Sequence, residues 1–509
     1  MYKKKILSSV IAVGFAMSAC SSDDDNGADD TAPPTAATAR TEPPPTDPPT
    51  TEPETTEAPT TEAPGTTTAS TEAPPEGSGL DAAFGTEGVL ATPQSDTDND
   101  RFITVLEGPD GQIYTAGFTS TGDDHMIAVS RLNPDGSLDD TFGDGGTAAI
   151  NVAEGGGGAE AGRGLVVQDD GKVVVAGPFE NNPTAEGDAA GDLDVAVIRL
   201  EADGTPDPTF GEAGIAKIDL GVGRTIDAET YITDNAWGLT ARDGGYAVFG
   251  TTPNQAADRT DVDFAIVGLT DTGTLDPAFG TEGVVIADIN ASGDNARNIR
   301  TASDGTILAT GYSRDGDGIV SPVLIRMSSQ GVLDETFGNG GIANNIILPG
   351  VAESYQVVPQ GDSYILAGYG RGEDPEATLD LVVYRFAADG SWGETFGTGG
   401  GLTQFDLEGE DDRARNITIL PDGNILAVGS GKLDADNVDA MVVMLDPDGV
   451  PVETFGDNGH VLIDLGGPAD AFFGVSLTAD ESAVLIAGFK GADPDGDEND
   501  DAVLARLAL

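Results

Sequence analysis

A short motif recurs along this 509-residue chain about every 60 residues, and this regularity constrains the fold more than any other feature. Clear copies are LDETFGNGGIA from Leu333 and LDDTFGDGGTA from Leu138. In all seven copies a phenylalanine is followed by a glycine: Phe84 and Gly85, Phe142 and Gly143, Phe210 and Gly211, Phe279 and Gly280, Phe337 and Gly338, Phe396 and Gly397, Phe455 and Gly456. Such a repeat indicates an array of similar units that pack on one another.

Each unit has the pattern of β-structure, as residues 284–327 illustrate. The apolar segments VVIADI, ARNIRTAS, TILATG and PVLIRM follow one another, and no long helical period competes with them. Asp304 and Gly305 separate the second segment from the third, and an Asp-Gly pair favours a tight hairpin because both residues can take positive φ. The sequence therefore predicts four short antiparallel strands per unit.

Seven such units predict an all-β chain folded as a seven-bladed β-propeller, since radial closure removes the exposed sheet edges of a linear array. A β-solenoid is the alternative, but units this long fit it less well. The body starts with a motif, which elsewhere follows a fourth strand, and it ends with DAVLARLAL, which has the pattern of a fourth strand. We therefore expect the motif near Leu80 to lie beside the last strand near Arg506.

The repeated motif is interpreted as structural, because a reactive site would be needed only once. The phenylalanine is expected to anchor the corner between consecutive blades, and the glycines permit turns that a Cβ would block. The motif aspartates are expected to accept hydrogen bonds from turn amides: Asp81, Asp139, Asp207, Asp276 and Asp334. An arginine near the end of the fourth strand is expected to pair with a local carboxylate: Arg131, Arg199, Arg326, Arg385 and Arg506.

The units resemble the bacterial delta-60 repeat, whose signature is LDxxFGxxGxx followed by a hairpin similar to DGKIxVAG. The resemblance covers residues 80–509 and departs at Gly393 and Val452, where the motif aspartate is missing. It implies a β-propeller on a secreted or surface protein. It implies no mechanism, because the family has no assigned biochemical activity.

The N-terminal segment MYKKKILSSVIAVGFAMSAC resembles a bacterial lipoprotein signal peptide, with residues 17–20 as the lipobox. The resemblance implies that residues 1–19 are removed and that Cys20 is lipidated, which would anchor the protein in the bilayer of the cell envelope, exposed outside the cell or in the periplasm. An ordinary secretory signal is the alternative. Residues 20–78 are rich in Thr, Pro and Glu and predict a disordered linker, and residues 79–509 form the predicted propeller.

The charge excludes one class of partner. With 88 acidic and 24 basic residues, the net charge of -64 would repel the phosphates of nucleic acids. Cations and neutral extracellular glycans or proteins stay possible. The single cysteine excludes an intrachain disulfide, and the protein is expected to be a monomer.

Few residues suit catalysis. His125 and His460 are the two histidines, so clustered histidine sites are excluded and carboxylates are the abundant candidates. Asp493, Asp495 and Asp497 alternate as at the start of a calcium loop, but Glu498 stands where such a loop needs glycine. They are weak candidates for Ca²⁺, and no other cofactor is predicted.

The loops that follow the third strand of each unit vary in sequence and are the expected binding surface. A recurring acid begins the strand after them: Asp194, Asp263, Asp380, Asp439 and Asp501. Its repetition favours a role in anchoring loops. Aromatic residues near the loop starts either contact a glycan or cap the blade cores: Phe118, Phe179, Tyr312, Tyr369 and Phe489.

These observations favour a non-enzymatic, surface-anchored binding or scaffold module over an enzyme. A carboxylate-based glycosidase is one alternative, and it would need two carboxyl groups roughly 5–9 Å apart. A calcium-stabilised structural module is the other.

Overall fold

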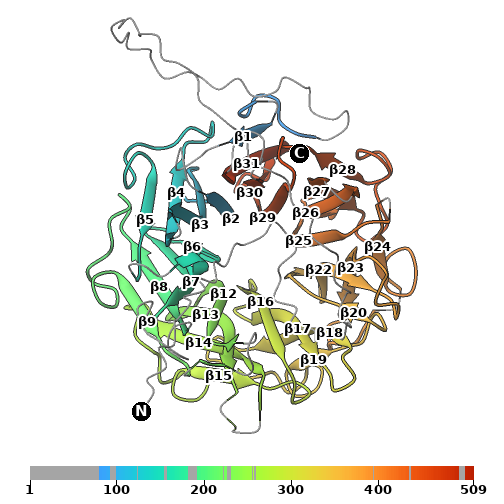
Figure 1. Ribbon diagram of the computed structural model, residues 1–509, viewed down its shortest axis with the longest axis horizontal. Helices are drawn as coiled ribbons and strands as arrows, with labels where there is room; N and C mark the ends of the chain where they lie inside the picture. The colour runs from blue at the N-terminus through green and yellow to red at the C-terminus, as the bar shows by residue number, and fades with distance from the viewer. Residues whose placement is uncertain are drawn as a thin grey trace, which may run out of the picture.

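The computed structural model describes residues 79–509 apart from 87, 92–98, 123, 154–156, 182–191, 222, 226–230, 255, 257–258, 394, 408, 435–436 and 492–498. The signal peptide, Cys20, the linker and the acidic run Asp493, Asp495 and Asp497 lie outside the described residues. The described strands form seven four-stranded antiparallel blades arranged in a ring, which confirms the predicted seven-bladed propeller (Figure 1).

The blades are numbered in chain order, and the strands of each are given from the centre of the disk outward, as the labels of β2, β12, β16 and β25 show in Figure 1. Blade 1 contains β2 (Asp100–Glu107), β3 (Ile113–Thr121), β4 (Asp124–Leu132) and β5 (Thr147–Ile150). Blade 2 contains β6 (Gly164–Val167), β7 (Val173–Glu180), β8 (Leu193–Leu200) and β9 (Ile215–Ile218). Blade 3 contains β12 (Asn235–Arg242), β13 (Gly245–Pro253), β14 (Val262–Thr270) and β15 (Val284–Ala287). Blade 4 contains β16 (Asp294–Thr301), β17 (Ile307–Arg314), β18 (Val320–Met327) and β19 (Ile342–Asn344).

The remaining blades follow the same order. Blade 5 contains β21 (Gln356–Gln360), β22 (Ser363–Arg371), β23 (Asp380–Phe386) and β24 (Leu402–Phe405). Blade 6 contains β25 (Asp412–Ile419), β26 (Ile425–Asp434), β27 (Asn437–Leu445) and β28 (His460–Ile463). Blade 7 contains β29 (Ala471–Leu477), β30 (Ala483–Lys490), β31 (Asp501–Ala508) and β1 (Val89–Ala91). Short elements between blades are η1 (Gly157–Ala159), β10 (Arg224–Thr225), β11 (Tyr231–Ile232) and β20 (Val351–Ala352), which joins blades 4 and 5 through one parallel bridge.

The sequence unit is not the structural blade, which corrects the assignment of the four strands of residues 284–327 to one unit. The first of those strands, β15, pairs with β14 and is the outermost strand of blade 3, whereas β16, β17 and β18 belong to blade 4. The motif turn reverses the chain after the third strand of a blade, so the next segment pairs at once with the strand it has just left. Each repeat thus completes the blade before it.

This offset closes the ring. Strand β1, the earliest in the chain, pairs with β31, the last, with Val89 opposite Ala505. The amide of Asp81 donates to the carbonyl of Arg506 at 2.8 Å, and Leu80 forms a bridge with Leu507. The expected contact between the first motif and the last strand is confirmed.

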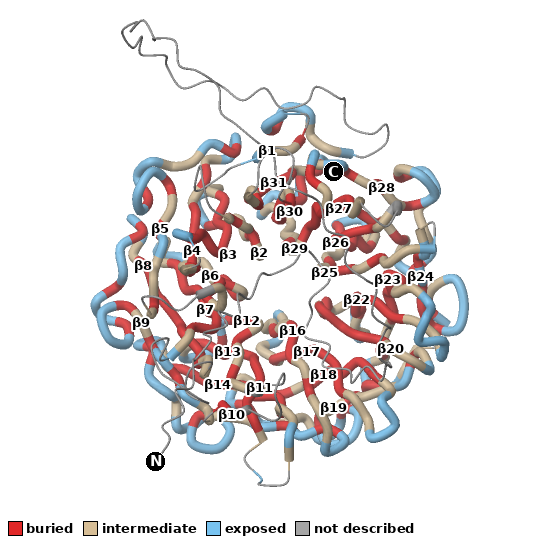
Figure 2. The backbone as a smooth tube through the Cα atoms, in the orientation of Figure 1, coloured by how far each residue is buried: buried red, intermediate tan, exposed pale blue. Residues whose placement is uncertain are grey.

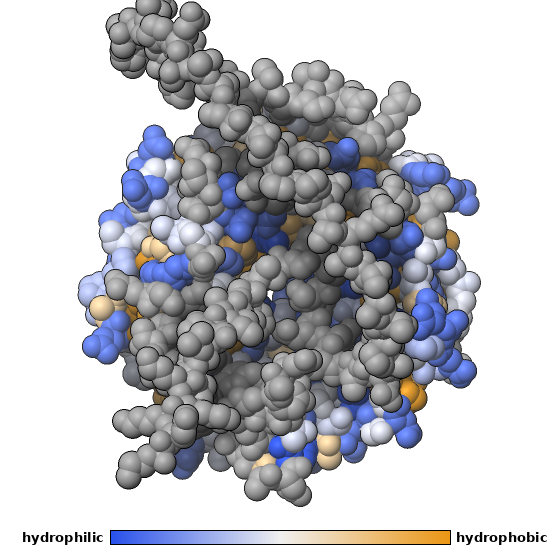
Figure 3. All heavy atoms as spheres, viewed as in Figure 1, coloured by the Kyte–Doolittle hydropathy of each residue, from blue (hydrophilic) through white to orange (hydrophobic). Residues whose placement is uncertain are grey.

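The hydrophobic core lies between neighbouring blades (Figure 2). The core shared by blades 1 and 2 includes Phe142, Val175 and Ile198, which are fully buried. Because each blade packs on a neighbour at both faces, its middle strands are buried almost throughout, as in β7. Figure 3 shows hydrophilic residues over much of the described rim. No helix in the described part of the chain is long and apolar enough to span a membrane.

The motif phenylalanines join one blade to the next, as predicted. Phe142 is fully buried, and a Cβ on Gly204, in the following blade, would lie 3.2 Å from its ring. The amide of Gly143 donates to the carbonyl of Asp203 in that same turn at 2.8 Å. The corner therefore combines an apolar contact with a backbone hydrogen bond.

The motif aspartates and strand arginines also behave as predicted where both are present. Asp334 accepts a hydrogen bond from the amide of Thr336 at 2.9 Å and forms an ion pair with Arg326 at 2.7 Å. The guanidinium of Arg326 lies 4.6 Å from the ring centroid of Phe337 and donates to the carbonyl of Ala388 in the next blade at 2.8 Å. The same ion pair with the motif aspartate is made by Arg131, Arg199 and Arg506.

Three blades depart from this arrangement, and in blade 6 Met444 and Val452 stand at the arginine and aspartate positions. Arg385 faces Gly393 instead of an aspartate, and its side chain is 3.5 Å from the Oε1 of Gln360. In blade 3, Gly268 occupies the arginine position, and Arg242 from the inner strand pairs with Asp276 at 2.6 Å instead. The guanidinium of Arg242 also lies 5.0 Å from the ring centroid of Phe279, the motif phenylalanine of that blade.

A second set of contacts surrounds the centre of the disk. The inner strands β2, β12, β16, β25 and β29 each have a register shift at the same place. Arginine and aromatic side chains at this level stack from blade to blade and are called the inner ring: Arg163, Trp237, Arg297, Tyr355, Arg415 and Phe473. Arg297, for example, lies 4.6 Å from the ring centroids of both Trp237 and Tyr355. Cation–π contacts therefore connect the blades at the centre.

Candidate functional site

Carboxylates gather on one face of the disk, where the loops enter the third strand of each blade and where the chain crosses to the next blade. We call it the loop face. The Asp-Gly turns between the first and second strands lie on the opposite face, because consecutive strands are antiparallel. At several blade junctions, three acidic positions come together on the loop face.

The first position is the recurring acid recognised in the sequence. Asp194, Asp263, Asp380 and Asp439 lie at or near the starts of β8, β14, β23 and β27, and all four are buried. Several have a local partner: Asn254 donates to Asp263 at 2.8 Å, and Asn437 donates to Asp439 at 3.0 Å. The expected role in loop anchoring holds for these two.

The second position is a buried acid directly before or at the start of the inner strand, which was not predicted. It is occupied in six blades: Asp100, Glu160, Asp234, Asp294, Asp412 and Asp470. Glu160 accepts hydrogen bonds from the amides of Val152 and Ala153 at 2.9 and 2.8 Å, so it fixes the crossover loop that precedes it. The acid lies three residues before the register shift in β2, β12, β16, β25 and β29, but a register shift cannot be seen in the sequence, and the neighbouring residues differ from blade to blade.

The third position is an exposed aspartate directly after an outer strand. Asp219, Asp288 and Asp464 follow β9, β15 and β28. Because an outer strand ends where the third strand of its blade begins, these aspartates lie beside the first position. They give these three junctions one carboxylate each that solvent can reach.

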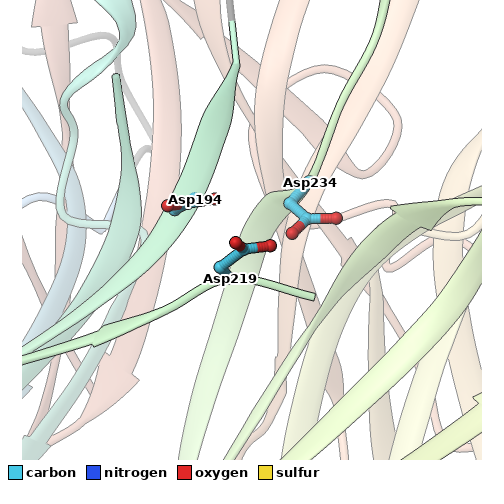
Figure 4. A group of neighbouring side chains, drawn as sticks. All are labelled: Asp194, Asp219 and Asp234. Atoms are coloured by element: carbon cyan, nitrogen blue, oxygen red, sulfur yellow. The ribbon is translucent and has the colours of Figure 1, made fainter. Parts of the chain in front are cut away.

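Among the residues that the structure describes, three groups of carboxylates have one oxygen from each member within 4.8 Å of the others: Asp194, Asp219 and Asp234; Asp261, Asp263 and Asp288; Asp439, Asp464 and Asp470. Figure 4 shows the first group, which we call the junction triad, where the side chains of blade 2 and of the segment before blade 3 lie near one another. Oxygen ligands at this spacing suit a hard cation such as Ca²⁺ or Mg²⁺.

The electrostatics of the junction triad are unfavourable without a cation. Burial, together with the charges of the neighbouring Asp219, Asp192 and Asp234, raises the pKa of Asp194 to about 7. Burial also raises the pKa of Asp234 to about 7, against the amide hydrogen bonds that it accepts from residues 220 and 221. The charges of these two buried carboxyl groups and the exposed one can therefore be neutralised either by protons or by a cation.

The other two groups differ in their partners. Arg259 is inserted among Asp261, Asp263 and Asp288, with nitrogen–oxygen distances of 3.7 Å to Asp263 and 2.9 Å to Asp288. In the group of blades 6 and 7, both oxygens of Asp470 accept backbone amides, including that of Gly491 at 3.0 Å. One group thus holds a cation supplied by the chain, and the other is stabilised by amides.

A groove of about 670 Å³ opens beside the junction triad. It is lined by β9, by Asp219 and by residues 273–275 of the following blade. Asp219 therefore belongs both to the triad and to the groove wall, so one member of the triad is open to solvent.

The remaining predicted residues are not brought to this site. The aromatic residues near the loop starts are at most 3% exposed, so they cap the blade cores and are not available to a glycan: Phe118, Phe179, Tyr312, Tyr369 and Phe489. His125 stacks on Phe118 with centroids 4.3 Å apart, and His460 lies in β28.

Comparison with known proteins agrees with this architecture. Residues 108–142, 168–210 and 302–337 match the model of a family described as a domain of unknown function (DUF5122) beta-propeller. No curated protein matches the chain in sequence.

Several solved structures are similar in fold. A polysaccharide lyase, Uly1, is 10% identical with a TM-score of 0.45, over 82% of this chain and 94% of that chain. A protein of unknown function from Dyadobacter fermentans is 12% identical with a TM-score of 0.40, over 83% of this chain and 99% of that chain. Trypanosoma rangeli sialidase is 12% identical with a TM-score of 0.37, over 82% of this chain and 56% of that chain. The three matching segments and the observed blades together identify the chain as a β-propeller.

Proposed function

We propose that this protein is a non-enzymatic binding or scaffold module, held at the bacterial cell envelope by a lipid on Cys20, with the loop face as its ligand-binding surface. The observation that carries the proposal is the gathering of carboxylates from successive blades on that one face. A rigid ring with acidic groups at its strand ends offers fixed positions to a cation or to a glycan or protein that cations bridge.

The same observation argues against the glycosidase alternative. Glycoside hydrolysis needs one unique pair of carboxyls with room for a sugar and, in inverting enzymes, a water between them. Here the acids recur at equivalent places in several junctions. Asp234 and Asp470 are fully buried, so neither could reach a glycosidic oxygen.

A binding and hydrolysis experiment separates the two functions. The purified protein would be applied to an array of extracellular glycans in calcium and in EDTA, and the same glycans would be incubated with it in solution. Saturable retention without new reducing ends is the expected result. Release of reducing ends that tracks the protein concentration would instead establish the glycosidase.

A further inference from the structure

The junction triad stands apart from the other acidic groups because two of its members have a buried oxygen without a hydrogen-bond partner among the described groups. These atoms are the Oδ1 of Asp194 and the Oδ1 of Asp234. Asp194 is 3% exposed and Asp234 is 0% exposed, so these two oxygens are not hydrated at the protein surface. A buried carboxylate oxygen left without a partner is costly.

The nearby polar groups are directed elsewhere. Lys217 lowers the pKa of Asp194 through space, but its ammonium donates to the carbonyl of Val152 at 2.9 Å and lies 4.7 Å from the ring centroid of Phe179. The hydroxyl of Thr252 is near Asp234 but does not reach hydrogen-bonding geometry with it. The two oxygens therefore face a space that the described side chains leave to another group.

We propose that the junction triad, Asp194, Asp219 and Asp234, binds one divalent cation, Ca²⁺ in an extracellular setting, and that this ion fastens blade 2 to blade 3. Asp194 and Asp219 come from blade 2, whereas Asp234 directly precedes the inner strand of blade 3. An ion held by all three would therefore link the two blades. This site rests on the proposed role of the loop face but specifies its ligand and its place.

The fold contains an internal precedent for a cation at this place. One junction further along, Asp263 and Asp288 correspond to Asp194 and Asp219, and the guanidinium of Arg259 lies between them. The chain supplies its own positive charge there. At the junction triad the same two carboxylate positions are present, and among the side chains that the structure describes no arginine forms an ion pair with them.

The ligand set points to calcium more than to a transition metal. All three protein ligands are carboxylate oxygens, which suit Ca²⁺ and Mg²⁺, whereas Zn²⁺ and Cu²⁺ favour nitrogen and sulfur. Waters entering past the exposed Asp219 would complete the coordination. With three protein ligands, the affinity is expected in the range of extracellular modules, with a dissociation constant of about 10⁻⁴–10⁻³ M.

Isothermal titration calorimetry tests the site. CaCl2 would be titrated into the metal-stripped protein and into Asp194→Asn and Asp219→Asn variants, with MgCl2 as a competitor. Each variant is expected to lose one calcium site or to bind there at least about tenfold more weakly, since one charged ligand is lost. Asp288→Asn is the matched control, because Arg259 already fills its junction, and its calcium binding should equal that of the unmodified protein.

The inference is overturned if the protein binds no calcium at about 10⁻³ M, or if both triad variants bind as much as the control. Because Asp219 is exposed, Asp219→Asn should fold, and a circular dichroism melt in EDTA checks this. A triad variant that loses calcium but still binds its glycan separates this site from the proposed function. A protein that binds calcium normally but no glycan would reject only the proposed function.

Discussion

At the scale of single residues, the buried acids before the inner strands determine how the protein responds to pH. Glu160 is fully buried and accepts two backbone amides, and burial raises its pKa to about 7. Burial likewise raises the pKa of Asp412 to about 7 and that of Asp294 to about 8. These groups hold a proton in the folded chain at a pH where the unfolded chain has released it.

The sign of the resulting pH dependence follows directly. Because the folded pKa of Glu160 is raised, its stabilising contribution is fully present below the unfolded value of 4.5 and is lost as pH rises from there through about 7. We expect the melting temperature to fall between pH 5.5 and pH 8, with Glu160 contributing about 2 kcal/mol of that change. Glu160→Gln should flatten the slope, as thermal melts across this pH range would show. Glu335→Gln, at an exposed position, should keep the original slope, and equal slopes in all three proteins would contradict the prediction.

The motif aspartates respond in the opposite sense at lower pH. Hydrogen bonds from the hydroxyl and amide of Thr336, together with Arg326, lower the pKa of Asp334 to about 2. A lowered pKa gives stability that is present above the unfolded value of 3.8 and is lost as pH falls toward 2. Stability should therefore be greatest at about pH 4, between the unfolded values of 3.8 for Asp334 and 4.5 for Glu160.

At the scale of the elements, single glycines decide whether a blade can accept its corner phenylalanine. A Cβ on Gly268 in β14 would lie 2.2 Å from the Cγ of Phe279. Gly268→Ala should therefore destabilise the protein by about 1–3 kcal/mol through overpacking. Urea denaturation measures the change. Gly293→Ala is the control, since a Cβ there meets nothing within 4 Å, and it should change the stability by less than about 0.5 kcal/mol.

The inner ring is the second link between elements. Arg297 contacts Trp237 and Tyr355 in the two neighbouring blades and lies 3.4 Å from the carboxylate of Glu353. Arg297→Met keeps most of the volume but removes the charge, and it should cost about 2 kcal/mol because Glu353 would keep a buried charge. The intrinsic fluorescence of Trp237 should shift at the same time. An unchanged melt and an unchanged emission spectrum would show that the stacking contributes nothing.

The arginine in the neighbouring junction offers a further test at this scale. Arg259→Ala removes the cation between Asp263 and Asp288 and leaves their carboxylates in place. If a divalent ion fits this geometry, the variant should bind one more calcium than the unmodified protein, with a dissociation constant of about 10⁻³ M. Calorimetry measures the number of sites. An unchanged number would show that the geometry at this junction is specific to a guanidinium.

At the scale of the whole molecule, stability depends on ring closure. Strand β1 completes the last blade, and Asp81 pairs with Arg506 across almost the full length of the chain. A variant that begins at residue 92 lacks this strand and exposes the edge of β31, so it should lose at least about 4 kcal/mol and tend to associate. A variant that begins at residue 79 should melt as one cooperative unit. Equal melts for both variants would show that closure does not limit stability.

The sequence by itself determined the number of blades, their β character and the way the ring closes. These properties follow from a periodic motif, because Phe-Gly pairs and Asp-Gly turns act locally and identically in each unit. The motif contacts could likewise be predicted, since Asp334 and Thr336 are two residues apart.

Only the tertiary structure decided which carboxylates meet. Asp194, Asp219 and Asp234 lie on three different strands or loops of two blades, so no local pattern joins them. The assignment of strands to blades also needed the structure. The strand that follows each motif turn pairs with the strand before the turn, and this pairing shifts the structural blade relative to the sequence repeat. The sequence left open whether the aromatic residues at the loop starts face solvent or the core, and the packing of neighbouring blades placed them in the core. Adjacent residues determine a local turn, whereas a site between two blades forms only when the blades pack side by side in the closed ring.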